Sequence, residues 1–124
     1  MKALVLRGVV ATLAAVLCTT VLAALARAAG VDLEVDGGET IPVSGIATVT
    51  GFFSLVGVVL AVVLRRWSAR PVALFVWLSV TLTALSLVPP LLYGADAATT
   101  LTLIGLHLVA AGVMIPNLAR GLRA

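Results

Sequence analysis

The charged residues of this 124-residue chain all lie outside four long apolar runs, so that no Asp, Glu, Lys or Arg falls inside a run. The runs cover about residues 8–26, 43–64, 72–93 and 97–118. An α-helix needs roughly 20 apolar residues to cross the hydrocarbon core of a bilayer. The pattern therefore predicts an all-α membrane protein, a four-transmembrane-helix bundle in which residues 1–124 form one membrane domain.

Composition supports this class and excludes others. The chain is 62% hydrophobic and 10% charged, whereas soluble domains are about 45–50% apolar and about 25% charged. The net charge of +3 comes from basic residues beside the apolar runs, where they face anionic lipid headgroups. We expect the lipid bilayer to be the main partner and expect no nucleic-acid binding.

The side on which each charge falls predicts the topology. Seven of the eight basic residues share one side: Lys2, Arg7, Arg65, Arg66, Arg70, Arg120 and Arg123. The other side holds the five acids and one base: Asp32, Glu34, Asp36, Glu39, Asp96 and Arg27. Loops rich in Lys and Arg remain in the cytoplasm. The sequence thus predicts a multi-pass plasma-membrane protein with cytoplasmic N- and C-termini.

The first run leaves open whether it is a retained span or a signal peptide. Residues 26–28 read Ala-Arg-Ala and resemble a cleavage site. Its apolar stretch of about 19 residues, however, is longer than the 7–15 residues of a signal-peptide core. We expect the run to be retained; cleavage would leave three spans in the same orientation.

Residues 31–43 have a different pattern. Apolar and acidic residues alternate from Val31 to Asp36, and Asp36 opens an Asp-Gly-Gly turn sequence. This alternation predicts a short extracytoplasmic β-hairpin between helices 1 and 2, in which Pro42 limits the second strand to an edge or ends it. A lone hairpin is marginally stable, so we expect its apolar residues to pack on the helix ends. Its acids would face water, and one would pair with Arg27.

Two features constrain the ends of runs three and four. Pro89 and Pro90 each lack an N–H, so the third helix must end or kink there. The carbonyls of Leu85 and Ser86 then need other partners, because the membrane interior supplies no water. Asp96 precedes run four and is expected to cap its N-terminus.

His107, the only histidine, lies about half-way along run four. Polar groups inside a span are costly and are often functional. Hydroxyl residues form one helical face of run three and one of run two: Ser79, Thr83 and Ser86, and Thr50 and Ser54. The simplest interpretation is a neutral His107 bonded to a hydroxyl on a neighbouring helix. One alternative is that His107 lies at the wall of a small polar crevice between runs two, three and four, which binds a ligand. Another is that His107 is a single axial ligand of a haem.

Catalytic and metal-binding chemistry finds little support. The single cysteine, Cys18, excludes an internal disulfide and a cysteine-based zinc site, and we expect it to be a buried apolar side chain. No GxSxG, HExxH or P-loop sequence is present. We therefore predict no catalytic residue, no metal site and no cofactor.

Several segments resemble a family of uncharacterised actinobacterial four-helix integral membrane proteins, a domain of unknown function. The matching stretches are residues 30–35, 39–43, 87–92, 96–99 and 107–110. The resemblance implies a four-helix membrane fold with a retained first span, and it implies no activity.

Two functions remain open. The first is a non-enzymatic scaffold or accessory subunit of a membrane complex, which binds another membrane protein or a second copy of itself. The alternative is a binder or carrier of a small apolar ligand, a lipid or a quinone, in a crevice near His107.

Overall fold

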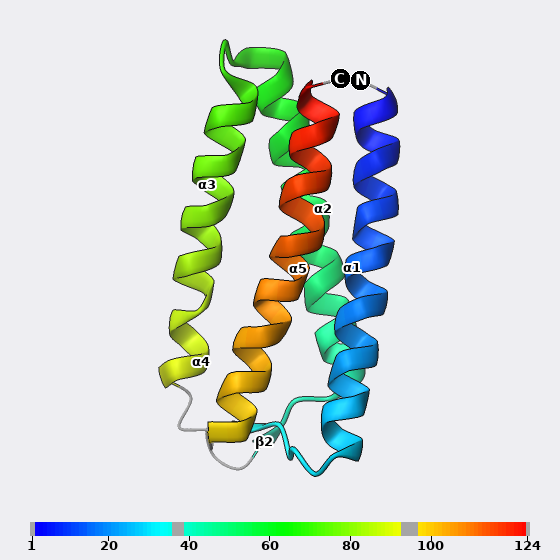
Figure 1. The fold of residues 1–124 in the computed structure, drawn as a ribbon, viewed down its shortest axis with the longest axis vertical. Helices are drawn as coiled ribbons and strands as arrows, with labels where there is room; N and C mark the ends of the chain where they lie inside the picture. The colour runs from blue at the N-terminus through cyan, green and yellow to red at the C-terminus, as the bar shows by residue number, and fades with distance from the viewer. Residues whose placement is uncertain (1, 36–38, 93–96, 124) are drawn as a thin grey trace.

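The computed structural model describes residues 2–35, 39–92 and 97–123. Its helices are α1 (Lys2–Ala28), α2 (Val43–Trp67), α3 (Pro71–Ser86), α4 (Val88–Leu92) and α5 (Ala97–Arg123). Four long helices run up and down beside one another, and the short α4 continues the line of α3 (Figure 1). The two termini and the α2–α3 connection lie at one end of the bundle, and the two short strands lie at the other.

Three of the helices have the length and apolarity needed to cross a membrane, namely α1, α2 and α5. The predicted helical membrane domain is confirmed at this level. The remaining long helix, α3, has 16 residues. At about 1.5 Å per residue it is about 24 Å long, short of a hydrocarbon core of about 30 Å. That the α3–α4 segment also spans the membrane stays a prediction.

The helices extend beyond the apolar runs at their basic end. Lys2 and Arg7 lie on the first turns of α1, and Arg120 and Arg123 lie on the last turn of α5. The structure therefore places on helical turns several charges that the sequence assigned to flanking segments. Long basic side chains allow this, because their stems cover apolar surface while their charged ends reach water.

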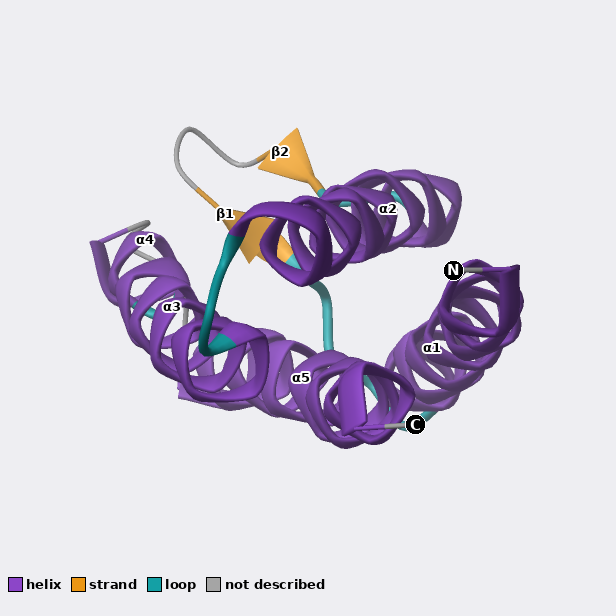
Figure 2. Ribbon diagram, turned by 90° about the horizontal axis from the view of Figure 1, so that it is seen from above, coloured by secondary structure: helices purple, strands orange, loops and turns teal. Residues whose placement is uncertain are grey.

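The packing is uneven around the bundle. Seen from above, α1, α5 and α3 form a curved row, and α2 lies on the concave side of that row (Figure 2). The most extensive helix interfaces are those of α1 with α5 and with α2. In contrast, Phe75 is the one buried residue of α3. The fold thus contains a trio, α1, α2 and α5, in which α1 packs closely on both other helices, and α3 is attached at one side, mainly through α5.

Two glycines allow the close approach within the trio. A Cβ atom on Gly8 would lie 2.7 Å from Cγ2 of Val58, and one on Gly121 would lie 2.8 Å from Cδ1 of Leu4. Both distances are far inside the roughly 3.5–4.0 Å of carbon–carbon contact. Small residues are the usual means by which membrane helices come together, and here they bring α1 against α2 and α5.

The predicted interruption of the third helix is confirmed. The helix ends at Ser86, and Pro89 and Pro90 fall in the first turn of α4, where a missing N–H leaves no bond unmade. The N–H of Leu87 donates to the carbonyl of Ala84 at 3.2 Å. The hydroxyl of Ser86 donates to the carbonyl of Thr83 at 2.6 Å. The hydroxyl thus supplies a donor at the point where the regular helical pattern stops.

The predicted β-hairpin is not established over residues 31–43. Two-residue strands, β1 (Glu34–Val35) and β2 (Glu39–Thr40), pair antiparallel. Elsewhere in the described part of this segment no residue belongs to a strand, and the predicted turn at residues 36–38 lies outside the described residues. The alternation fails because Leu33 has a left-handed backbone, with φ 55°. This segment is therefore mainly an irregular loop between two helices.

A glycine directs the chain from α1 into this loop. Gly30 has φ 103°, and its N–H bonds the carbonyl of Arg27 at 3.1 Å. The N–H of Val31 bonds the carbonyl of Ala26 at 3.0 Å. Together these two bonds form the Schellman motif, in which a glycine with positive φ ends the helix. The motif turns the chain back so that Leu33 reaches the helix ends.

We expect Gly8→Ala to destabilise the fold by about 1–3 kcal/mol, because its Cβ overlaps the stiff side chain of Val58. Gly57→Ala is the matched control, since its Cβ would lie 3.8 Å from Leu118. Both changes raise helix propensity equally. Thermal unfolding in detergent measures the difference. Equal stability of the two variants would contradict the close-approach role of Gly8.

Candidate functional site

His107 bonds within its own helix. The ring is half-buried, and its Nδ1 lies 2.7 Å from the backbone oxygen of Leu103, one turn earlier. A carbonyl oxygen only accepts, so Nδ1 carries the proton and Nε2 of the neutral ring is an acceptor. The expectation that a hydroxyl of a neighbouring helix bonds His107 is not met: none of the hydrogen bonds between described residues joins them. The carbonyl of Leu103, four residues earlier on the same helix, accepts the hydrogen bond of the ring, so this bond needs no neighbouring helix.

The hydroxyl residues that the sequence grouped with His107 are divided between two places. On α2, the hydroxyl oxygen of Thr50 lies 3.2 Å from that of Thr19, within hydrogen-bond distance, and Ser54 is buried. On α3, Ser79 and Thr83 are half-buried, and Ser86 bonds the backbone of its own helix. The α2 pair therefore serves the packed trio, whereas the α3 group lies on the loosely packed side.

Sequence reasoning missed the polar groups of α1. Thr12 and Thr19 are both buried and donate to the carbonyls of Gly8 and Ala15 at 2.8 and 2.9 Å. The hydroxyl oxygen of Thr20 is buried and has no hydrogen-bond partner in the described part of the chain. The available signal was the seven-residue spacing of Thr12 and Thr19, which places them on one helical face. Cys18, expected to be buried, is exposed on the surface of α1.

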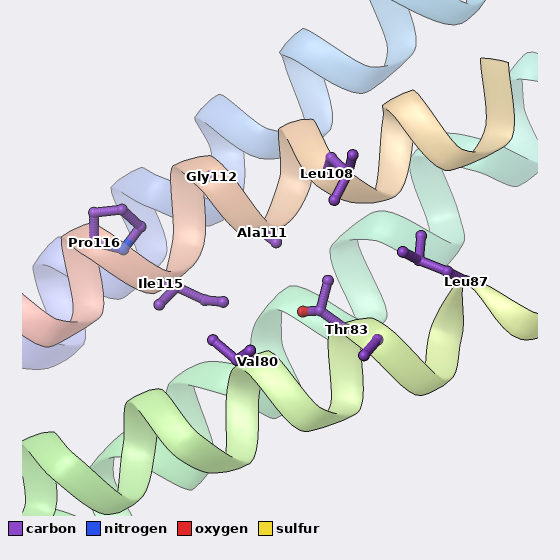
Figure 3. A pocket seen from close by; sticks show the side chains of 9 residues that line it. Val80, Thr83, Leu87, Leu108, Ala111, Gly112, Ile115 and Pro116 are labelled. Atoms are coloured by element: carbon purple, nitrogen blue, oxygen red, sulfur yellow. The ribbon is translucent and has the colours of Figure 1, made fainter. Parts of the chain in front are cut away.

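A groove of about 430 Å³ separates α3 from α5 (Figure 3). One wall consists of Val80, Thr83 and Ala84 of α3 and of Leu87, which follows α3. The α5 wall consists of Leu108, Ala111, Gly112, Ile115 and Pro116. Val80 and Thr83 on one side and Ala111 and Ile115 on the other point toward one another across it. Thr83 is a member of the predicted crevice, but the crevice was placed beside His107, and His107 does not line this groove.

The groove exists because its α5 wall is small. A Cβ atom added to Gly112 would meet no heavy atom within 4 Å, and Ala111 offers only a methyl group. Pro116 cannot donate a helical N–H to the carbonyl of Gly112, which loosens the helix at this level. Small residues here leave space instead of bringing the helices into contact.

The acidic end, which carries Asp32, Glu34 and Glu39, is fixed to the bundle at two adjacent residues. Leu33 is 0% exposed and packs in an apolar cluster with Ala23, Ile46, Leu103 and Leu106. Thr99, also 0% exposed, donates its hydroxyl to Oδ1 of Asp32 at 2.9 Å. Since Thr99 lies in the first turn of α5, the carboxylate stands beside a helix N-terminus, where negative charge is stabilising.

The predicted orientation of this segment is confirmed where the structure describes it. Leu33 is buried, Val31 is half-buried and Asp32 is exposed. The side chains of Glu34 and Glu39, and all of Asp36, lie outside the described set, as does Asp96 with its predicted capping role. Arg27 is exposed at the end of α1, and its pairing with a carboxylate stays a prediction.

The basic end is held together by arginine. Nη1 of Arg65 donates to the backbone oxygen of Gly121 at 3.3 Å, which joins the last turns of α2 and α5. The guanidinium carbon of Arg66 lies 5.5 Å from the ring centroid of Trp67, within the range of a cation–π contact. No acidic side chain occurs between Glu39 and Asp96 or after Asp96. This end therefore has a basic surface without carboxylate side chains.

These features define a helical membrane protein whose charges are separated between its two ends. Within the described part of the chain, no group of three His, Cys, Asp or Glu residues is placed to hold a metal ion. The chain belongs to a family of unknown function, DUF6069, whose match covers residues 1–124. No curated protein and no solved structure is significantly similar to it.

We expect Thr99→Val to destabilise the protein by about 1.5–3 kcal/mol, since it removes a partly buried hydrogen bond to a charged group while keeping the side-chain shape. Thr102→Val is the control, because the Thr102 hydroxyl bonds only the carbonyl of Ala98 on its own helix. Thermal unfolding and limited proteolysis of the loop measure the effect. A Thr99 variant as stable and as protected as the control would contradict the anchoring role of this bond.

Proposed function

We propose that the protein is a non-enzymatic subunit or scaffold of a plasma-membrane complex and that its acidic loop recognises another membrane protein. The observation that supports this most strongly is the anchoring of the loop by Leu33 and by the Asp32–Thr99 bond. The two anchors hold the loop on the bundle at residues 32 and 33, and the acidic composition of the segment favours recognition of a basic surface.

The proposal includes an orientation. The basic end faces the cytoplasm and the acidic end faces outward, in accord with the preference of Lys and Arg for the cytoplasmic side. The packing of α1 supports its retention as a span, because α1 supplies buried residues along its length, from Leu4 to Ala23. Removal of α1 would expose the faces of both α2 and α5.

We expect Ser68→Cys, in the α2–α3 connection, to resist membrane-impermeant maleimide applied to intact cells and to react after permeabilisation. Gly30→Cys is unsuitable as the opposite probe because of its positive φ, so Ala29→Cys serves instead and is expected to react in intact cells. Ala29 is exposed just beyond the end of α1. Labelling of Ser68→Cys from outside would overturn the orientation.

The recognition role is tested by copurification from native membranes. We expect a partner of the parent protein to be lost from the Glu34→Gln/Glu39→Gln variant and retained by Arg27→Gln, a control that alters charge at the same end. Quantitative mass spectrometry after in-cell cross-linking measures both. A strictly monomeric, partner-free parent, or unchanged recovery by the double variant, would contradict the proposal.

The geometry of His107 favours a second candidate, the binding of a quinone or lipid. The bond to Leu103 fixes the ring and leaves Nε2 free to accept from a ligand hydroxyl. His107→Gln retains hydrogen bonding and His107→Leu removes it. Loss of a copurified ligand from both folded variants supports binding. Loss of stability in the leucine variant alone makes His107 a packing residue, and parental behaviour of both variants rules out this candidate.

A further inference from the structure

We propose that the groove between α3 and α5 binds an anionic phospholipid, with an acyl chain in the groove and the headgroup phosphate at Arg120 and Arg123. This site is independent of the partner recognition proposed for the acidic end. It also differs from the candidate ligand position at His107, which does not line the groove.

The walls of the groove suit a hydrocarbon chain. Eight of its nine lining residues have no polar side-chain atom, and Thr83 is the exception. A volume of about 430 Å³ lies within the range of about 300–1,000 Å³ that is usual for small-molecule sites. Since the chain supplies no side chain to fill the space beside Gly112, the surrounding lipid is the available occupant in a membrane.

The position of two arginines supplies the headgroup site. Arg120 follows the groove residue Pro116 by four positions, and Arg123 follows it by seven, so that all three share one face of α5. At about 1.5 Å per residue, Arg120 and Arg123 lie about 6 and 10 Å beyond Pro116 along the helix. Both arginines are exposed. A phosphate at their level therefore has its acyl chain directed along the groove.

These arginines differ from Arg65 and Arg66 at the same end. Arg65 donates to Gly121 and Arg66 lies against Trp67. Among the described residues, by contrast, neither Arg120 nor Arg123 has a side-chain hydrogen bond or an ion pair. The two parts of this face match the two parts of an anionic phospholipid. The apolar groove suits an acyl chain, and the two guanidinium groups at its basic end suit the phosphate, because arginine binds phosphate oxygens in bidentate fashion.

A second copy of the chain is a poorer occupant of this face. Two copies inserted in the same orientation and joined along α5 would bring Arg120 and Arg123 of one beside those of the other. Like charges placed face to face oppose association. An anionic lipid neutralises the same charges, so charge complementarity favours the phospholipid.

The test uses the full chain in nanodiscs that contain phosphatidylcholine and a minor fraction of phosphatidylglycerol. Native mass spectrometry of the released protein measures the retained ratio of the two lipids. We expect the parent to prefer phosphatidylglycerol and each of Arg120→Gln and Arg123→Gln to lower that preference about fivefold, the effect of one basic residue at a charged membrane surface. Arg66→Gln removes one charge from the same end and is expected to retain the preference.

The groove is tested separately by Gly112→Leu, which fills it. Gly105→Leu is the matched control, because both glycines lie on α5, both face open space and only Gly112 lines the groove. We expect Gly112→Leu to lose the retained lipid and Gly105→Leu to keep it, while helical circular dichroism and elution volume confirm folding of both.

Four results would overturn the proposal. An equal loss for Arg66→Gln would indicate diffuse surface charge. Unchanged lipid retention by Gly112→Leu would exclude the groove. Equal retention of the two lipids by the parent would exclude headgroup recognition. Loss of a dimer from Gly112→Leu, with lipid retention unchanged, would assign the groove to a second copy.

Discussion

The cost of placing an ionised side chain in hydrocarbon organises this molecule. Even scales based on biological insertion assign about 2.5–3.5 kcal/mol to one Arg, Lys or Asp at the centre of a span. Every Asp, Glu, Lys and Arg that the structure describes accordingly lies at one of the two ends of the bundle or in a connection beyond them. The same medium offers no water to backbone groups, so helices fill the apolar region. Where the helical hydrogen-bond pattern is interrupted at Leu87, the hydroxyl of Ser86 donates to the carbonyl of Thr83.

Lipid also changes what holds helices together. Between membrane helices the hydrophobic effect contributes little, and association depends on close packing and on hydrogen bonds. The α1–α2–α5 trio has both: Gly8 and Gly121 permit near contact, and Thr19 bonds Thr50 across α1 and α2. The α3 side has neither at the level of Gly112, and a groove remains there. The bundle therefore has a closely packed part around α1 and a loosely packed part between α3 and α5. The second part has a surface that is open to lipid or a partner.

The sequence predicted what depends on local composition. Apolar runs predicted the helices, Pro89 and Pro90 predicted the interruption, and the alternation of Leu33 with its acidic neighbours predicted which side chain is buried. The sequence did not predict the features that depend on how the helices pack against one another. The partner of His107 depends on rotamer, the groove depends on how far α3 stands from α5, and the buried hydroxyls of Thr12 and Thr19 lie on an alanine-rich helix without a strong periodic signal. The hairpin was overestimated because nothing in the alternation reveals the left-handed conformation of Leu33.

The central claim is that the apolar belt of the bundle lies in the bilayer with the basic end at one interface. The two tryptophans test it, because Trp67 ends α2 at the basic end and Trp77 lies on α3, and both are exposed. In nanodiscs, Trp67→Phe and Trp77→Phe each leave one tryptophan for quenching by lipids brominated at different depths. We expect Trp77 to be quenched most by bromine deep in the acyl chain and Trp67 most by bromine near the headgroup. Deep quenching of Trp67, or no quenching of Trp77 at any depth, would contradict the account.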